Sequence, residues 1–286
     1  MELNSEIPTL PPRDAATVVM LRDGAQGLEV FLVKRHGLSD VLGGAYVFPG
    51  GKLDAADCDA AHHAHFDRDP SELHAALGES DTDQATACGL FVAALRETFE
   101  ESGVLFARAT GTSTAASNEF HARLAAQQLR LHTSAVQPWT RWITPLMPSV
   151  TNKRFDTRFF VTRLPDDQIA AHDNHETTEI LWATPRNALI QYWQGHIVLA
   201  PPQIMSLSHL CLFNSVAHAL TEAAQRTPPV IMPEPFDQEG MRVICYPGDP
   251  KHPVSQRALP GPTRLHFRNK RFEPEGGLEA LLHGPL

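Results

Sequence analysis

The sequence predicts an α/β (α+β) fold, with a core of interleaved strands and helices followed by a C-terminal extension. Two observations indicate this class. Between residues 15 and 225, β-prone segments alternate with segments whose apolar residues recur at helical spacing. Beyond residue 227 the chain becomes rich in Pro and Gly and carries only short β-like pieces.

The composition suits a globular protein and excludes several function classes. The 286 residues are 42% hydrophobic and 20% charged, which is typical of a chain with a substantial core. A net charge of -9 argues against a general nucleic-acid binder, which needs clustered Lys and Arg for phosphate contacts. No run reaches the roughly 18 apolar residues of a membrane helix. Four cysteines without a C-x-x-C pair indicate a reduced, cytoplasmic setting. We therefore expect neither nucleic acid nor membrane as a partner, and a homodimer is left open.

The N-terminal elements are expected in a simple order. Residues 1–14 are interpreted as a Pro-bearing leader. Segments 15–21 and 28–35 are apolar and β-prone, and the turn between them predicts a hairpin. Residues 36–46 form a loop, and "VFPGG" at 47–51 then enters a glycine-rich turn.

The middle of the chain contains an interruption and then a helix. Residues 58–84 are acidic and His-rich and predict an irregular insertion with a short helix near 70–77. Residues 85–102 predict a longer helix, and Gly103 stands where a C-cap glycine belongs. Its apolar stripe comprises Val92, Leu95 and Phe99.

The remaining elements complete the domain organisation. Further strands are expected at 140–147, 155–164 and 179–185, and further helices at 119–130, 185–194 and 201–225. We divide the chain into the leader 1–14, a main domain 15–227 with the insertion 58–84, and an extension 228–286 packed on that domain.

The helix at 85–102 carries a cluster of acids. Glu97, Glu100 and Glu101 fall at i, i+3 and i+4, which places their Cβ atoms about 5–6 Å apart on one face. Such a carboxylate cluster is typical of a site for a hard divalent cation, Mg²⁺ or Mn²⁺. The alternative is an ordinary solvated helix face, in which Arg96 and Glu100 form an i,i+4 pair. The glycine turn favours the metal site, since Gly50 and Gly51 allow the backbone to approach a ligand closely.

These two segments together resemble the Nudix hydrolases, whose box reads G-x5-E-x7-R-E-U-x-E-E-x-G-U with U a bulky apolar residue. Gly51 matches the first glycine, and Asp57 stands at the position of the first glutamate. The second half of the box is matched by Arg96, Glu97, Glu100, Glu101, Gly103 and Val104. Thr98 departs at the first U position, and residues 58–95 stand where the box has seven.

The interruption resembles one branch of this superfamily, the acyl-coenzyme A diphosphatases. Members open with "VFPGG.LD.AD", continue with a long insertion, and resume with a helix such as "REtFEEsGvL"; "VFPGGKLDAAD" and "ALRETFEESGVLF" are similar to both parts. The segments "WITP", "RFDTRFF", "LAPPQ" and "YPGDP" also look like this branch, so the resemblance covers roughly residues 15–250. It implies a Nudix fold, in which a mixed β-sheet is sandwiched between helices.

The resemblance also implies roles for the box residues. Glu97, Glu100, Glu101 and the backbone of Gly51 would hold Mg²⁺ or Mn²⁺. Glu97, Glu100 and Arg96 are the candidate catalytic residues, with Arg96 orienting the carboxylates. The general base would be Glu97 or an acid in a later loop, for which Glu176 and Glu179 are candidates.

The implied substrate is the diphosphate of coenzyme A or an acyl-coenzyme A. Candidate substrate-binding residues are Arg35, Gly50 and Lys52. The coenzyme A signature asks for an arginine four residues before Gly44, where this chain has Asp40, and Lys34 with Arg35 is an alternative partner for a 3′-phosphate. Aromatic residues that could stack an adenine, or equally fill the core, are Trp139, Trp142, Phe159 and Phe160.

Other interpretations stay open. The chain could be a Nudix hydrolase of another nucleotide, such as an ADP-sugar or dinucleotide, or a non-catalytic nucleotide-binding module. Three crowded carboxylates argue against a silent module, which has no need of them. Within the insertion, a structural zinc site is an alternative to a solvated loop or a lid, although ligand spacings typical of zinc are missing. The Cys and His residues considered for it are Cys58, His62, His63, His65 and His74, with Cys88 just beyond the insertion.

Overall fold

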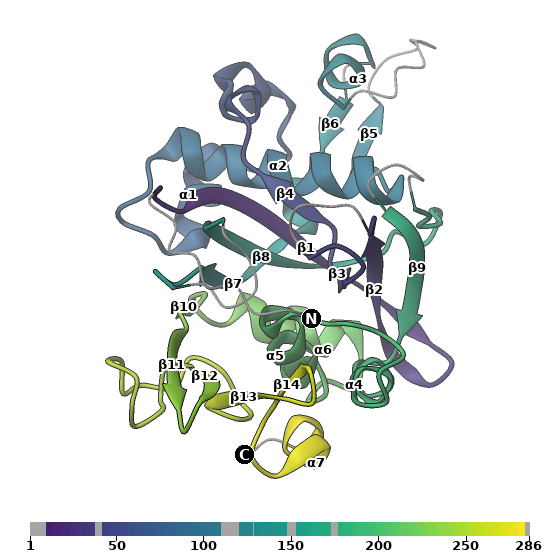
Figure 1. Ribbon diagram of the computed structural model, residues 1–286. Coiled ribbons are helices and arrows are strands. Elements are labelled where there is room, and N and C mark those ends of the chain that lie inside the picture. The colour runs from purple at the N-terminus through teal and green to yellow at the C-terminus, as the bar shows by residue number, and fades with distance from the viewer. Residues whose placement is uncertain are drawn as a thin grey trace.

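The structure is a computed structural model, and it describes residues 10–37, 42–109, 120–127, 129–147, 153–172 and 177–283. A central sheet lies between helices above it and helices below it, and the C-terminal segment forms the lowest part of the molecule (Figure 1). The sheet is mixed, because parallel and antiparallel strand pairs occur side by side. The predicted α/β fold with a mixed sheet between helices is therefore confirmed.

Among the described residues the central sheet has eight strands, in the order β10-β7-β8-β1-β2-β3, with β4 paired to β1 and β9 to β2. The bounds are β1 (Arg13–Gly24), β2 (Gly27–Arg35), β3 (Tyr46–Val47), β4 (Gly50–Lys52), β7 (Gln137–Ile143), β8 (Phe155–Arg163), β9 (Thr177–Ala183) and β10 (Val230–Ile231). The strands expected near 140–147, 155–164 and 179–185 correspond to β7, β8 and β9.

Strand β1 organises this sheet because both of its edges are paired. One edge pairs in parallel with β8 along its length. The other edge is divided: its C-terminal part forms the predicted hairpin with β2, and residues Ala15–Thr17 pair with β4. The glycine turn expected at 47–51 is thus partly a strand, which fixes Gly50 and Gly51 on the sheet.

The two faces of the sheet support two hydrophobic clusters. Alternate residues of a strand point to opposite faces, so Val18 and Met20 face one cluster while Val19 and Leu21 face the other. The first cluster packs under α1 (Pro70–Leu77) and α2 (Gln84–Ser102). The second packs against α4 (Pro185–Trp193), α5 (Pro201–Leu210) and α6 (Val216–Ala224). None of the helices in the described ranges is both long and apolar enough to cross a membrane.

Helix α2 has well-defined ends. The Asp83 side chain caps the N-terminus by accepting a hydrogen bond from the Thr86 N–H. Gly103 ends the helix with a positive φ of 71°, and its N–H donates to the Phe99 carbonyl. Val92 and Leu95 are buried. The predicted helix, its apolar stripe and its C-cap glycine are confirmed.

The insertion is part of the fold and not a solvated loop. The short 3₁₀ helix η1 (Ala55–Cys58) leads into it, η2 (Ala60–His65) lies within it, and α1 coincides with the helix expected at 70–77. Phe66, Leu73 and Leu77 are buried in the cluster beneath α2. Residues 58–84 therefore contribute apolar side chains to the core.

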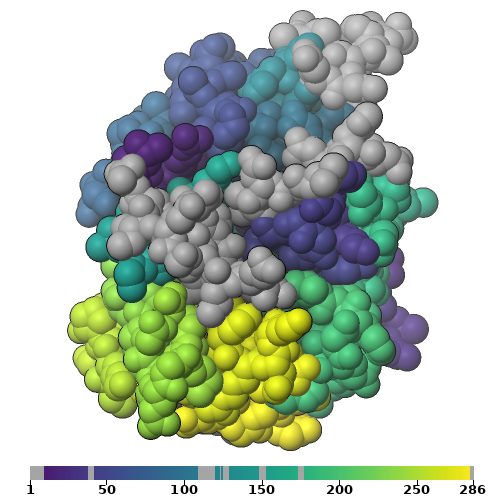
Figure 2. All heavy atoms as spheres, viewed as in Figure 1, coloured from purple at the N-terminus to yellow at the C-terminus, as the bar shows by residue number. Residues whose placement is uncertain are grey.

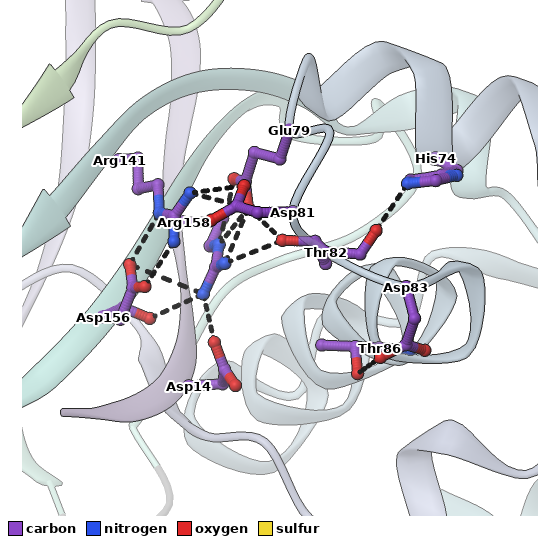
Figure 3. Close-up of polar contacts among 10 residues, drawn as sticks. All are labelled: Asp14, His74, Glu79, Asp81, Thr82, Asp83, Thr86, Arg141, Asp156 and Arg158. Atoms are coloured by element: carbon purple, nitrogen blue, oxygen red, sulfur yellow. Dashed lines mark hydrogen bonds and ion pairs between the residues drawn. The ribbon is translucent and has the colours of Figure 1, made fainter. Parts of the chain in front are cut away.

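A buried ionic network fixes the end of this insertion to the sheet (Figure 3). Glu79 follows α1, and its Oε2 lies 2.6 Å from Arg158 Nη2 and 3.1 Å from Arg141 Nη1. Arg158 also contacts Asp14 on β1, and Arg141 Nη2 lies 2.7 Å from Asp156 Oδ2. We call these five residues the Glu79 network. The side chains of Arg158 and Glu79 are 3% and 6% exposed, so the pairs are largely shielded from water.

The described part of the C-terminal extension packs on the rest of the chain. Figure 2 shows its residues, coloured green-yellow to yellow, filling the lower part of the visible face. Tyr246 and Phe272 belong to the same buried cluster as Trp139 of β7, and β10 joins the central sheet. The extension forms β11 (Glu234–Gln238), β12 (Met241–Cys245), β13 (Arg264–Arg268), β14 (Arg271–Glu273) and α7 (Gly277–Leu282).

Two predicted helices had wrong bounds. The segment 201–225 is not one helix, because α5 ends at Leu210 and α6 begins after Ser215, whose side chain accepts from the His218 N–H as an N-cap. The helix expected at 119–130 is α3 (Phe120–Gln127), which is followed by β6 (Leu129–Leu131). β6 pairs with β5 (Ala107–Ala109), and its Leu129 and Leu131 are buried at strand spacing.

Candidate active site

The glycine turn and the C-terminal half of α2 meet in space, although the insertion separates them in sequence. The Gly50 N–H donates to Glu101 Oε2 at 3.1 Å. A Cβ added at Gly51 would lie 2.3 Å from Glu97 Oε1, and one at Gly50 would lie 2.4 Å from the Ala16 carbonyl oxygen. Neither contact leaves room for a side chain, so both glycines are needed for this close approach.

Arg96 is the centre of the hydrogen-bond arrangement. Its Nε and Nη2 donate to the two oxygens of Asp57, each at 2.9 Å. Its Nη1 donates to Glu97 Oε1 at 2.8 Å and to Glu100 Oε2 at 3.0 Å, and Nη2 also donates to the Lys52 carbonyl at 3.1 Å. All five N–H groups of the guanidinium have an acceptor, which fixes its plane.

Asp57 forms the buried side of this arrangement. Its residue exposure is 1%, and its Oδ2 also accepts from the Asp54 N–H at 2.9 Å. Burial alone would raise the pKa of Asp57, but hydrogen bonds from His121 and Arg96 and the charge of Arg96 outweigh it and lower the pKa to about 2. Asp57 therefore stands as a buried anion that orients Arg96, in the position that the box gives to its first glutamate.

The three predicted acids differ in their surroundings. They gather at one end of α2 as the spacing predicts, but the side chain of Glu100 is 40% exposed and that of Glu97 13%. Glu101 differs from both, since it is buried and only 3% exposed as a residue. Its contact with the Gly50 N–H explains why a carboxylate is tolerated there.

The donor types at this site fit a hard divalent cation. Glu97, Glu100 and Glu101 provide carboxylate oxygens, and Glu97 packs closely against Gly51. Within the described ranges, no three His, Cys, Asp or Glu side chains are arranged to hold a metal ion. Arg96 supplies positive charge between Glu97 and Glu100 and contacts one oxygen of each carboxylate, Oε1 of Glu97 and Oε2 of Glu100, so a cation would be bound through the other oxygen.

The candidate substrate-binding residues lie in different settings. Gly50 lies in the turn described above. The ammonium of Lys52 is exposed and 2.7 Å from Asp54 Oδ1. Arg35 is half-buried at the end of β2, and its Nε is buried without a hydrogen-bond partner among the described residues. Such a donor is suited to an anion, while Gly44 N–H donates to the Arg35 carbonyl and shapes the adjoining turn.

Glu179, a candidate general base, is engaged elsewhere. Its Oε1 accepts from Lys34 Nζ at 2.7 Å and its Oε2 from the Tyr46 hydroxyl at 2.8 Å. The hydrogen bond from Lys34 lowers the pKa of Glu179, which makes it a weak proton acceptor. Tyr46 belongs to the cluster on the face away from α2, so this trio lies across the sheet from the acid helix. The other candidate, Glu176, lies outside the described residues, as does Asp40.

The remaining sequence-based candidates are structural. The four aromatic residues proposed for adenine stacking are buried in the core. The Cys and His residues of the insertion do not form a metal site, since no such group occurs in the described parts of the chain. The lid interpretation of the insertion is disfavoured by its buried side chains and by the Glu79 network.

Two features were not foreseen from the sequence. His121 on α3 places Nε2 3.2 Å from Asp57 Oδ1. Thr98, which departs from the box, is fully buried and donates its hydroxyl to the Ala94 carbonyl at 2.7 Å. This internal hydrogen bond lets a polar residue occupy an apolar position of the helix. His121 stands well beyond the box and follows no motif.

Comparisons with known proteins agree on one family. A family model described as the NUDT19 Nudix domain matches residues 12–210. Acyl-coenzyme A diphosphatase NUDT19 from Homo sapiens is 29% identical, and the match covers 79% of this chain and 72% of that protein. The Xenopus laevis protein of the same name is 26% identical, with 79% and 71% covered. The crystal structure of a NUDIX hydrolase from Alicyclobacillus acidocaldarius has a TM-score of 0.61 and 28% identity, covering 74% of this chain and 97% of that one.

Proposed function

The chain belongs to the Nudix hydrolases, in the NUDT19 Nudix domain family, and is thus a pyrophosphohydrolase acting on diphosphate bonds; from this premise we propose that it cleaves the diphosphate of coenzyme A or an acyl-coenzyme A. The observation that carries the proposal is the meeting of the glycine turn with the acid helix across the insertion. Gly50 contacts Glu101 and Gly51 contacts Glu97, so both halves of the box form one site.

The proposed mechanism assigns each box residue a physical task. Glu97, Glu100, Glu101 and the Gly51 carbonyl would hold one or more divalent cations, Mg²⁺ or Mn²⁺. When bound, such an ion neutralises diphosphate oxygens and lowers the pKa of a bound water. Glu97 is our choice of general base, because it lies directly against the glycine turn. Arg96, itself held by Asp57, keeps Glu97 and Glu100 in place.

The substrate class is supported by the relatives and by one residue of this chain. The vertebrate relatives in the comparison carry the name acyl-coenzyme A diphosphatase. Arg35 offers a buried Nε without a partner among the described residues, and it would pair with a phosphate of the ligand. Lys52 is exposed beside the turn and would contact the same substrate. The expected products are 3′,5′-ADP and 4′-phosphopantetheine.

A substrate panel tests this proposal. Coenzyme A, an acyl-coenzyme A, ADP-ribose and a diadenosine polyphosphate are each incubated with Mg²⁺ or Mn²⁺, and products are separated by chromatography. We expect the coenzyme A compounds to turn over fastest, with no turnover in a chelator. Faster cleavage of ADP-ribose or the dinucleotide would refute the substrate, and nucleotide binding without cleavage would indicate a silent module.

A single substitution tests the acid helix. Glu101→Gln keeps an oxygen that can accept from the Gly50 N–H, so the fold should survive while the cation loses a charged ligand. We expect at least about a hundredfold loss of kcat, in the range for removing one group that stabilises charge in the transition state. The matched control is Glu72→Gln on α1, an exposed acid outside the site. Equal activity of Glu101→Gln and the control would refute the assignment.

A further inference from the structure

The orientation of Arg96 depends on Asp57, and Asp57 has one more contact than the box explains. Its Oδ2 accepts from Arg96 Nη2 and the Asp54 N–H, and its Oδ1 accepts from Arg96 Nε. The fourth contact is made by His121 Nε2, which lies 3.2 Å from Asp57 Oδ1. A carboxylate has about four lone-pair sites, so these four contacts saturate it.

His121 is held over Asp57 by its own neighbours. Its ring stacks on that of His62 from the insertion, with centroids 5.3 Å apart and planes 20° apart. The His62 ring is fixed in turn by a 2.9 Å contact between its Nε2 and the Ala56 carbonyl. Neither nitrogen of His121 makes a hydrogen bond of good geometry within the described residues, although both are buried. The 3.2 Å contact with Asp57 is therefore the polar interaction that the structure gives this ring.

We propose that His121 is a positioning residue that holds Asp57 and, through Asp57, fixes the guanidinium of Arg96 against Glu97 and Glu100. The inference rests on the proposed function, since it makes Arg96 the support of the acids that would bind the cation. His121 does not touch these acids itself. Its imidazole shields a carboxylate whose side chain is 0% exposed, while 32% of its own side chain remains exposed. It also joins α3 and the insertion to the box, because His62 packs on its other side.

The first experiment is a double-mutant cycle on the cation-free protein. His121→Leu, Asp57→Asn and the double variant are compared with the parent by urea unfolding. We expect His121→Leu to lower the folded-to-unfolded ratio by about tenfold, because the buried Asp57 carboxylate loses a polar contact at 3.2 Å. In the Asp57→Asn background the same change should cost less than about twofold, since its partner is already altered. Equal losses in both backgrounds would overturn the proposal.

The second experiment separates positioning from packing. His121→Gln places an amide N–H close to the position of Nε2, whereas His121→Asn reaches only the position of Nδ1. We expect His121→Asn and His121→Leu to lower kcat by about tenfold with KM unchanged, as for other residues that orient metal ligands. His121→Gln should restore most of kcat. The control is His63→Leu, which removes the imidazole next to His62 in the insertion. A Gln variant as impaired as the Asn variant would overturn the proposal.

The two experiments also separate this inference from the proposed function. Coupling between His121 and Asp57 in the unfolding cycle, with no diphosphate cleaved by any variant or by the parent protein, would refute the function and leave the positioning role standing. Normal hydrolysis by the parent protein, without coupling between His121 and Asp57, would refute the positioning role and leave the proposed function standing.

Discussion

Replacing Glu79 by Gln tests whether the insertion is anchored to the sheet. The substitution keeps the size of the side chain and removes its charge. Glu79 accepts two hydrogen bonds from Arg158 Nε, at 3.0 and 3.2 Å, and one from Nη2 at 2.6 Å, and Arg141 lies 3.1 Å away. A glutamine offers one acceptor oxygen, and its amide N–H groups would face the N–H groups of the two arginines.

The expected loss follows from burial. The side chains of Arg158 and Arg141 are 3% and 13% exposed, so the charges left behind cannot be fully hydrated. Removing one partner of a buried ion pair costs about 3–5 kcal/mol. Asp156 and Asp14 still face Arg158, so we expect the lower end, about 3 kcal/mol. For a slope near 3 kcal/mol per M, this lowers the urea midpoint by about 1 M.

The assay is equilibrium unfolding in urea at neutral pH, followed by far-UV circular dichroism. The matched control is Glu72→Gln in the same insertion, whose pair with Arg68 is 3.5 Å long with Glu72 59% exposed. An exposed pair of this kind contributes about 0.5 kcal/mol or less. A midpoint for Glu79→Gln that equals that of the control would refute the anchoring role of the Glu79 network.

Three further predictions concern the candidate site. Gly51→Ala should lower kcat by at least about tenfold, because the new Cβ would lie 2.3 Å from Glu97 Oε1 and displace that carboxylate; parental activity would contradict the role of the turn. The folded-state pKa of Asp57, about 2, lies below its unfolded value, so its stabilisation is complete above about pH 4 and is lost as the pH falls toward 2. Asp57→Asn should therefore remove the loss of stability between about pH 4 and pH 2 from the acid unfolding profile. An unaltered profile would contradict a stabilising role for the ionised Asp57. Glu179→Gln should leave kcat within about twofold, since Glu179 is paired with Lys34, and a hundredfold loss would restore it as general base.

The parts of the fold predicted correctly are those with strong local patterns. Helix α2 has a periodic stripe and a C-cap glycine, and β1 and β2 are apolar, β-prone segments joined by a short turn, so neighbouring residues suffice to define them. The break between α5 and α6 was missed because 201–225 keeps a helical pattern throughout, while Ser215 restarts the helix by capping it. A local side chain-to-backbone hydrogen bond prevailed over the apolar periodicity.

The candidate site also has residues that the sequence predicts and residues that it does not. The link of Arg96 to Glu100 follows from i,i+4 spacing, whereas its link to Glu97 and the contact of Gly51 follow from the motif. His121 could not be found, because it reaches the site through the folding back of α3, which no local pattern encodes.

Long-range charge pairs could not be predicted from the sequence either. Glu79 and Arg158 are far apart in sequence, and each alone looks like an ordinary surface residue. The insertion was accordingly interpreted as a solvated loop or a lid. An acidic composition is expected of exposed loops, but it says nothing about which single acid is buried against a distant arginine.

The parallel pairing of β1 with β8 has a consequence for the protein during its synthesis. Arg13 at the start of β1 is paired with Phe155, so the ribosome must complete more than half of the chain before this partner exists. At about 5–20 residues per second, the wait is on the order of ten seconds. During that time β1, which is apolar on both faces, can form its hairpin with β2 but presents its other edge unpaired. The nascent chain is thus most exposed to aggregation before β8 emerges, and chaperone capture would matter most in that interval.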